Sequence, residues 1–384
     1  MDGPKNWRSR GCAAIAAAVI LAIGHAPIAA AAHAGSGPHK RLVIIDQDAY
    51  GPAGSNMQAI LMLLQADDVD VLGITITSGD GWRDEEVDQT LRLLEIAGRT
   101  DVPVVPGAVL PLVNSQARTK AWEALYGRLY YKGAWTESWP DQGVARRTPH
   151  PADPYRVPPS PAGTPHTRAS DETAAEFLVR QLRLHPGEVT LIAAGPLTNI
   201  ALAARLDPHF SGLAQELVFM GGSFNPVPAD NAFAAEYANA PRREFNMRWD
   251  PEAASLVLRE PWRKITEVPV DPTTKTFFTP AMIKQVSLGR APFAAYIGQF
   301  GQSYPMWDEL AVAVWLDPSI VTHNVPLLVD VDTSFTAGYG NTLSWSIGEG
   351  PGLGEGPVHV VLDIDRSKFE ALALQLLGRA SRHD

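Results

Sequence analysis

Short apolar runs alternate with amphipathic stretches along most of the chain. The run Leu42–Ile45 is typical of a buried strand, and apolar residues then recur at helical spacing over 57–64. Similar runs predict strands at 69–77, 102–105, 189–193, 217–220, 265–270, 327–331 and 358–364, with helical patterns at 83–98, 171–184, from 200, from 250 and at 369–377. Because strands alternate with helices, we predict an α/β fold: a doubly wound, mostly parallel central sheet flanked by helices.

The alternation is interrupted between Asn114 and Ser170. The first half of this segment is crowded with tryptophan and tyrosine, and 149–165 is rich in proline, which disfavours regular structure. We interpret about 114–170 as an insertion that leaves the sheet. It is either a flap over a site or a surface insertion that packs its aromatic side chains on the domain.

The first 34 residues have the pattern of a secretory signal peptide. Three basic residues come first, then the apolar run 13–23, then Ala32-His33-Ala34, which resembles a cleavage site. We therefore expect an exported protein, periplasmic or secreted, in which residues 35–384 form one domain. An uncleaved N-terminal anchor is the alternative.

The charge of the chain limits the kinds of partner that it suits. The formal net charge is −10, and Cys12 is the single cysteine. The first 34 residues carry three basic residues and one acid, so their removal leaves 350 residues, a net charge of −12 and no thiol. Such an acidic chain does not suit nucleic acid or an anionic membrane. It is compatible with a soluble protein that handles a neutral or cationic small molecule.

Two acids, Asp46 and Asp48, follow the first predicted strand directly. The next helix begins after a short loop, where Ser55 or Asn56 can cap it. Open α/β sheets bind ligands at the carboxyl ends of their strands. Clustered carboxylates suit a hard cation with oxygen ligands better than a phosphate. The alternative is a pair of solvated acids in a turn.

Several short motifs follow one another in an order that resembles the nucleoside hydrolase family, the inosine-uridine type N-ribohydrolases. The similarity covers nearly all of the chain after residue 34. The motifs are Asp46-Gln47-Asp48 with Ser55-Asn56, 72–75 with Gly79-Asp80, 91–99, 102–108, 194–201, 220–222, 244–246 with 250–254, and 307–311 with 316–318.

This resemblance implies an exported, Ca²⁺-dependent enzyme that hydrolyses the N-glycosidic bond of ribonucleosides to ribose and free base. It implies that Asp48 is the general base, which takes a proton from the attacking water. The implied Ca²⁺ ligands are Asp48, Asn56, Asp308 and the backbone carbonyl of Ala194. The implied substrate-binding residues are Ser55, Asp80, Asn239, Glu244, Asn246 and Trp307.

Four of these positions, in three departures, differ from the family pattern. Ser55 and Asn56 replace paired acids, and the loss of ligand charge weakens calcium binding. Asp80 stands where asparagine is usual. Trp307 replaces a histidine linked with protonation of the leaving base; tryptophan can stack on a base but cannot usefully donate a proton. A non-purine base, or another way to activate the leaving group, follows as a hypothesis.

The sequence leaves other interpretations open. Asp250 and Asp317 precede prolines and are expected to cap helices, Thr198 and Asn199 to satisfy a helix start, and Trp307 can belong to the core. The pocket can also belong to a nucleoside- or sugar-binding protein without turnover, or to a hydrolase of a non-nucleoside glycoside. The base preference and the oligomeric state, a homo-oligomer included, are open.

Overall fold

The computed structural model describes residues 40–136, 150–226 and 240–380. The predicted signal peptide, residues 1–34, and the predicted substrate-binding residue Asn239 lie outside the described residues.

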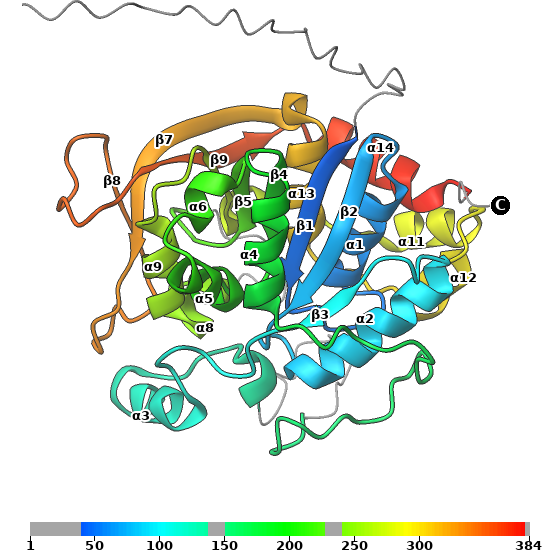
Figure 1. Ribbon diagram of the computed structural model, residues 1–384, viewed down its shortest axis with the longest axis horizontal. Helices are drawn as coiled ribbons and strands as arrows, with labels where there is room; N and C mark the ends of the chain where they lie inside the picture. Colours follow the sequence, from blue (N-terminus) through cyan, green and yellow to red (C-terminus); the bar gives the residue numbers. More distant parts are fainter. Residues whose placement is uncertain (1–39, 137–149, 227–239, 381–384) are drawn as a thin grey trace, which may run out of the picture. The chain divides into compact units, whose positions relative to one another are not determined.

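A mixed sheet forms the centre of the described chain, and its strands run in the order β3-β2-β1-β4-β5-β6-β9-β7-β8 (Figure 1). The strands are β1 Arg41–Gln47, β2 Val69–Ile76, β3 Val104–Pro106, β4 Val189–Ala193, β5 Glu216–Met220, β6 Ile265–Val268, β7 Val321–Val331, β8 Thr342–Trp345 and β9 Pro357–Ile364. Neighbours from β3 to β9 pair in parallel, and β7 is antiparallel to both β9 and β8. The predicted doubly wound, mostly parallel sheet is confirmed.

Helices cover both faces of this sheet. They are α1 Ser55–Gln65, α2 Arg83–Ala97, α3 Gln116–Tyr126, α4 Ala174–Leu184, α5 Thr198–Leu206, α6 Phe210–Leu213, α8 Phe245–Trp249, α9 Pro251–Leu258, α10 Val270–Thr273, α11 Pro280–Ser287, α12 Ala294–Phe300, α13 Trp307–Leu316 and α14 Arg366–Gly378, with 3₁₀ turns at Gly133–Trp135 (η1) and Pro318–Ile320 (η2). Helices α1, α13 and α14 pack together, as do α4, α5 and α9.

The side-chain alternation of the strands divides the core into two layers. Along β1, Val43 and Ile45 belong to the core that includes α1 and α13, whereas Ile44 belongs to the core that includes α4 and α5. Successive side chains of a strand point to opposite faces, so a strand covered on both faces must be apolar throughout. This explains why β1 reads as a continuous apolar run.

Some element boundaries differ from the sequence prediction. The N-cap of α1 is Gly54, without a side-chain cap, so the prediction that Ser55 or Asn56 caps this helix is wrong. Helix α4 starts at Ala174, where Thr173 and Glu176 form a capping box. Strand β7 begins at Val321, and β8 was not predicted. The first half of β7 is largely solvent-facing, so it lacks the apolar run that marks an interior strand.

The described parts of the 114–170 segment lie along the edge of the sheet where β1 and β2 end (Figure 1). Residues after 150 follow α2: Trp82 Nε1 donates to the carbonyl of Pro151 at 2.7 Å, and Arg92 Nε to that of Ala162 at 2.9 Å. In the earlier part, Trp135 stacks on Trp249 with ring centroids 4.0 Å apart. Among the described aromatic residues of the segment, Trp122 and Trp135 are buried, whereas Tyr126 and Tyr155 are exposed.

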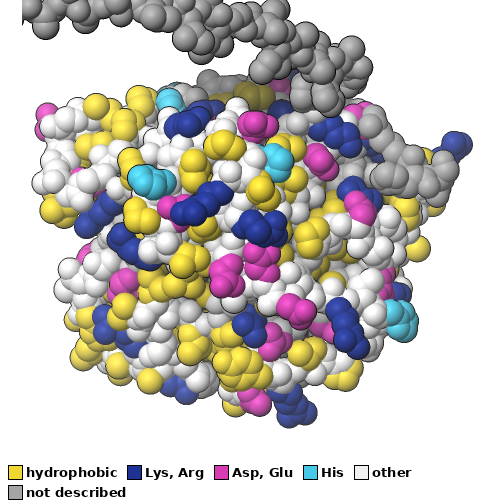
Figure 2. Space-filling view, in the orientation of Figure 1, with side chains coloured by type: hydrophobic (Ala, Val, Ile, Leu, Met, Phe, Trp, Pro, Cys, Tyr) yellow, Lys and Arg dark blue, Asp and Glu magenta, His cyan; other side chains and the backbone are white. Residues whose placement is uncertain are grey.

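The surface carries charges of both signs. On the face shown in Figure 2, Lys and Arg side chains are interspersed with Asp and Glu rather than gathered in a field of one sign. Within the described part of the chain, no helix is both long enough and apolar enough to cross a membrane.

Candidate active site

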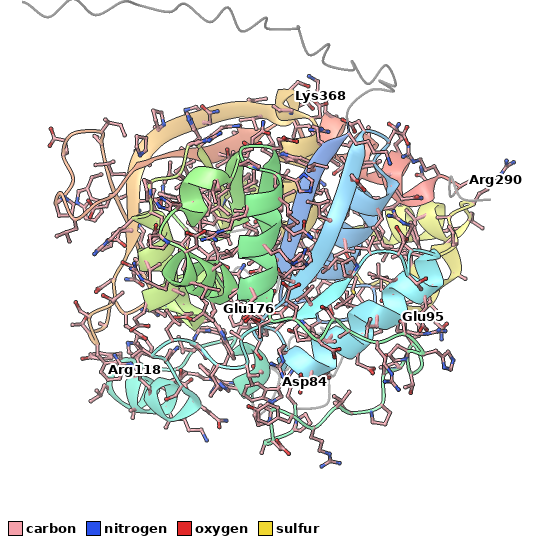
Figure 3. The ribbon with its side chains drawn as sticks, in the orientation of Figure 1. Asp84, Glu95, Arg118, Glu176, Arg290 and Lys368 are labelled. Carbon is pink, nitrogen blue, oxygen red and sulfur yellow. The ribbon has the colours of Figure 1, made fainter. Side chains whose placement is uncertain are left out.

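Asp48 lies just after β1, at the edge where the parallel strands end. Asp84, labelled in Figure 3, marks the start of α2 at the same edge. The Asp48 carboxylate is 2% exposed; its Oδ2 accepts from the backbone N–H of Asp80 at 3.0 Å. Glycines make room for it, because a Cβ at Gly79 would lie 2.2 Å from Oδ2 and one at Gly195 would lie 2.8 Å from Oδ1. The loops after β2 and β4 therefore close around this carboxylate.

Burial raises the pKa of Asp48 well above its usual range, and the neighbouring carboxylates of Asp80, Glu86 and Asp308 raise it further. Burial likewise raises the pKa of Asp308, with Glu309 and Asp80 adding to the effect. Like charges that interact in a low-dielectric interior favour the neutral acid. A cation between them would reverse this effect.

Asn56, in the first turn of α1, contacts Asp48 directly. Its Nδ2 donates to Asp48 Oδ1 at 3.2 Å and to Gln47 Oε1 at 3.1 Å. The predicted metal ligand is therefore beside Asp48, and in this rotamer its amide nitrogen faces the carboxylate.

Ser55 connects α1 with α13. Its hydroxyl donates to Glu309 Oε2 at 2.6 Å and accepts from the backbone N–H of Asp308 at 3.0 Å. Its single hydroxyl hydrogen is thus used by Glu309, whose pKa burial raises to about 8. These bonds connect Asp308 and Glu309 to the start of α1, so the Glu309 carboxylate lies next to Ser55.

Glu244 and Asn246 lie at the start of α8. The Glu244 carboxylate is 3% exposed and accepts from the N–H groups of Gly222 at 3.2 Å, Asn246 at 2.9 Å and Met247 at 3.1 Å. Its charge contributes to the raised pKa of Asp308, which places it near the same cluster. The Asn246 amide instead donates to the Met220 carbonyl at 3.0 Å, so it is used in holding α8 against β5.

The remaining predicted residues flank the cluster. Ala194 follows β4, is 1% exposed and precedes Gly195, which packs against Asp48. Trp307 is the first residue of α13 and is half-buried against the core that includes Met306 and Leu310. It therefore precedes Asp308 and contributes to the core at the same time.

The donor set fits a hard cation. Among the described residues, no three Asp, Glu, His or Cys side chains are grouped to hold a metal ion. The predicted set is different in kind: two carboxylates (Asp48, Asp308), an amide (Asn56) and a backbone carbonyl (Ala194), all oxygen donors of the type that Ca²⁺ prefers. Gln47 Nε2 is buried without a hydrogen-bond partner in the described structure. If the Asn56 and Gln47 amides were both rotated by a half-turn, Gln47 Nε2 could donate to the Asn56 oxygen. That oxygen would then also face Asp48 Oδ1, and only a cation bound between the two oxygens would make this arrangement favourable.

Three polar residues predicted near this edge serve the fold instead. Asp46 Oδ1 accepts from the Thr75 hydroxyl and from Asn199 Nδ2, and burial raises the pKa of Asp46 to about 7. Thr198 donates to Asp250, and Asn199 also accepts from the Ala108 N–H. The prediction that Thr198 and Asn199 satisfy their own helix start is therefore wrong, because they connect neighbouring elements. Asp250 and Asp317 do cap helices, as predicted.

Sequence reasoning missed three residues of this cluster. Glu86, fully buried, accepts from the Gly81 N–H at 2.6 Å; burial and the charge of Asp80 raise its pKa. In the sequence it is simply one of three successive acids near the start of the helical pattern at 83–98. Glu309 could have been suspected because it directly follows Asp308. Tyr131, whose hydroxyl donates to Asp80 Oδ1 at 2.5 Å, carries no signal of its own in the sequence.

The fold and this edge together define a class: an α/β protein whose parallel strands end in a buried cluster of carboxylates around Asp48. Residues 43–371 match the family described as "Inosine-uridine preferring nucleoside hydrolase". The chain belongs to this family of nucleoside N-ribohydrolases, which are enzymes.

Individual relatives agree with this assignment. The chain is 33% identical over 218 residues to "Probable uridine nucleosidase 2" of Arabidopsis thaliana, which covers 57% of this chain and 56% of that protein. It is 28% identical over 348 residues to "Uridine nucleosidase 1" of the same plant, covering 86% and 90%. A solved plant nucleoside hydrolase shares the fold, with a TM-score of 0.66 and 22% identity over 88% of this chain and 99% of that one.

Proposed function

We propose that this protein hydrolyses the N-glycosidic bond of ribonucleosides to ribose and free base, with Asp48 as the general base. The observation that carries this proposal is the convergence of Asp48, Asp80 and Asp308 at one sheet edge in a chain of this family. Relatives named as uridine nucleosidases and as an inosine-uridine preferring hydrolase support ribonucleosides as the substrate class.

Asp48 takes a proton from the water that attacks C1′. As the bond between C1′ and the base breaks, the base nitrogen keeps the electron pair and then takes a proton from solvent. Asp48 must be ionised to take this proton, and a cation bound beside it would favour the ionised form against the effect of burial. Positive charge develops on the sugar in the transition state, and the surrounding carboxylates of Asp80 and Asp308 stabilise it.

The sugar is held by groups around this base. Asp80 and Glu244 both belong to the cluster around Asp308, and their carboxylate oxygens accept hydrogen bonds from ribose hydroxyls. Ser55 and its partner Glu309 provide a further acceptor at the start of α1. Asn239 stays a predicted sugar-binding residue, and Asn246 contributes by holding α8 in place. Fixed orientation of the sugar supplies a large part of the rate.

We propose Ca²⁺ as the cofactor, bound by Asp48, Asn56, Asp308 and the carbonyl of Ala194. When bound, such a cation supplies positive charge that acidifies a neighbouring water and attracts sugar hydroxyls. Support comes from the all-oxygen donor set and from carboxylates that raise one another's pKa. With one carboxylate replaced by Asn56, we expect calcium affinity to be lower than in a site with a third acid.

A second candidate is a nucleoside-binding protein without turnover. The observation in its favour is that Asn56 Nδ2 donates to Asp48 Oδ1, a bond that stabilises the ionised base but opposes a metal ligand role for the amide. Trp307, which stacks on a base more readily than it donates a proton, is compatible with either candidate.

The test is product formation by the chain from residue 35 onward, incubated with calcium and a panel of ribosides that includes inosine and uridine. We expect free ribose and free base, and no activity after chelation until calcium is restored. Tight nucleoside binding by calorimetry without product over long incubation would favour the second candidate. If only a non-nucleoside glycoside is consumed, the substrate class is wrong.

We further propose that residues 1–34 direct export and are removed. The support is the basic, apolar and small-residue pattern of this segment, which the family match from residue 43 leaves outside. Expression with the native N-terminus and Edman sequencing of the exported protein would test this: a start near residue 35 supports it, and a start at Met1 contradicts it.

A further inference from the structure

The hydroxyl of Tyr131 holds the carboxylate of Asp80. Tyr131 lies between α3 and η1, Asp80 lies in the loop after β2, and the O–H donates to Asp80 Oδ1 at 2.5 Å across 51 residues of sequence. A hydrogen bond to an ionised acceptor is short and roughly twice as strong as one between neutral groups. This bond therefore fixes the orientation of the Asp80 side chain.

Tyr131 also contacts α8, at whose start Glu244 lies. Its ring lies against Phe245, with centroids 4.7 Å apart and planes tilted by 59°, and its carbonyl accepts from Arg248 Nη2 at 2.6 Å. Phe245 directly follows Glu244, the N-cap of this helix. One residue thus connects the two carboxylates assigned to the sugar.

The chain just after Tyr131 is locked to the Asp80 loop. The N–H of Ala134 donates to the Gly79 carbonyl at 2.9 Å. Gly133 has φ +52°, and a Cβ there would lie 2.0 Å from the same carbonyl oxygen, so only glycine fits. Because backbone contacts fix this segment, the phenol does not depend on a mobile loop for its position.

The position of the Asp80 carboxylate matters for the whole site. The backbone N–H of Asp80 donates to Asp48 Oδ2 at 3.0 Å, so Asp80 lies directly beside the proposed general base. A turn of this side chain would alter both its hydrogen bond to the sugar and the field on the general base. Residues that lock such groups in place contribute to binding because the bound geometry is already formed.

We propose that Tyr131 is a positioning residue for sugar recognition: its hydroxyl orients Asp80 while its ring and backbone set Asp80 and Glu244 at a fixed separation. This inference rests on the proposed nucleoside hydrolysis and names a residue that acts through Asp80. It predicts that loss of the Tyr131 hydroxyl weakens substrate binding, and that this effect disappears in a variant whose residue 80 can no longer accept a charge-assisted hydrogen bond.

The experiment compares Tyr131→Phe, Asp80→Asn and the double variant, with Tyr126→Phe as the matched control in the same segment. Tyr126 is 43% exposed and packs on Trp122, away from the acids. We expect Tyr131→Phe to raise KM about tenfold with little change in kcat, as for the loss of one charge-assisted bond. In the Asp80→Asn background the same change should have little effect. Tyr126→Phe should behave as wild type.

The inference is overturned if Tyr131→Phe matches the control, or if it lowers kcat and thermal stability equally in both backgrounds, since that pattern marks a purely structural role. If the wild type binds nucleosides without turnover, calorimetry replaces KM, and a tenfold weaker dissociation constant for Tyr131→Phe still supports positioning. If the wild type hydrolyses nucleosides but the Tyr131 variants do not show the expected change in KM, the proposed function stands and the positioning role of Tyr131 is wrong. Absence of any nucleoside binding by the wild type overturns both.

Discussion

The aliphatic part of strand β1 and the two acids at its end are buried to the same degree, with opposite energetic consequences. Asp46 lies within the strand and Asp48 just after it. Ile44 and Ile45 are fully buried, and Asp46 and Asp48 are 1% and 2% exposed. Burial of each isoleucine side chain stabilises the fold by about 1.5–3 kcal/mol. Burial of each carboxylate instead raises its pKa, which records a cost of keeping it charged.

The two ends of the strand therefore have different tasks. The aliphatic half joins helices on both faces of the sheet, and this packing can hold an edge that is unfavourable by itself. At that edge, buried atoms lack partners in the described residues, among them Glu86 Oε2 and both carboxylate oxygens of Glu267 on β6. Such unsatisfied groups in a stable fold are expected where a ligand completes the structure. Substitutions in the two regions should separate activity from stability.

The largest effect is expected from Asp48→Asn, because it removes the general base. We expect kcat to fall about 10³-fold. Stability without calcium should be unchanged or higher, because the variant no longer buries a charge among Asp80, Glu86 and Asp308. Steady-state kinetics and urea unfolding measure the two quantities. Activity within tenfold of wild type would exclude Asp48 as the base.

Leu61→Ala in α1 should give the opposite result. Leu61 is fully buried in the core that α1 shares with α13, and such truncations cost about 2–5 kcal/mol. The folded enzyme should keep its kcat, because the change lies in packing alone. Chemical unfolding beside kinetics at low temperature tests this. A loss of kcat as large as that of Asp48→Asn would mean that core and edge are not separable.

Asp250 offers a test of how burial alone changes the pKa of an acid, apart from the effect of a cluster of acids such as that around Asp48. It caps α9 and accepts from Leu112, Thr198 and Ala253, and burial raises its pKa from 3.8 to about 6. An acid with a raised folded-state pKa favours the protonated folded protein, so its contribution is lost as pH rises from about 4 to about 6. At about 1.4 kcal/mol per pKa unit, this is on the order of 2–3 kcal/mol.

Asp250→Asn should therefore unfold with a flatter pH dependence between pH 4 and 6. Urea unfolding of both proteins at several pH values gives the difference in free energy. The wild type should lose stability relative to the variant as pH rises through this window. A difference that does not change with pH would mean that Asp250 is ionised at an ordinary pKa in the fold.

The smallest expected effect is a gain. Asn56→Asp adds a third carboxylate beside Asp48 and Asp308, and more ligand charge strengthens calcium binding. We expect calcium affinity to rise about tenfold, as measured by calorimetry. Without calcium the added charge should lower stability. If the calcium affinity of Asn56→Asp is unchanged, the ion binds elsewhere. Asn246→Asp, in α8, serves as the control, because it adds the same charge away from the proposed calcium ligands.

Much of the fold follows from local pattern. The apolar runs at 42–45 and 189–193, and the helical spacing at 57–64, involve neighbours in sequence, whose periods of 2 and 3.6 are set by the backbone. The motif order was enough to indicate the family and to name Asp48 and Asp308. Periodicity failed where a strand faces solvent, as in the first half of β7. Capping preference failed at Thr198 and Asn199, whose side chains bond to distant elements.

What only the tertiary structure decided is which side chains share the edge. Ser55 meets Asp308 across 253 residues and Tyr131 meets Asp80 across 51, and neither separation leaves a local signature. These meetings depend on the order of the strands and on the packing of α13 against α1. The sequence determined the elements and the identity of the acids; their mutual burial, and hence their raised pKa values, arose only when distant elements packed together and excluded water.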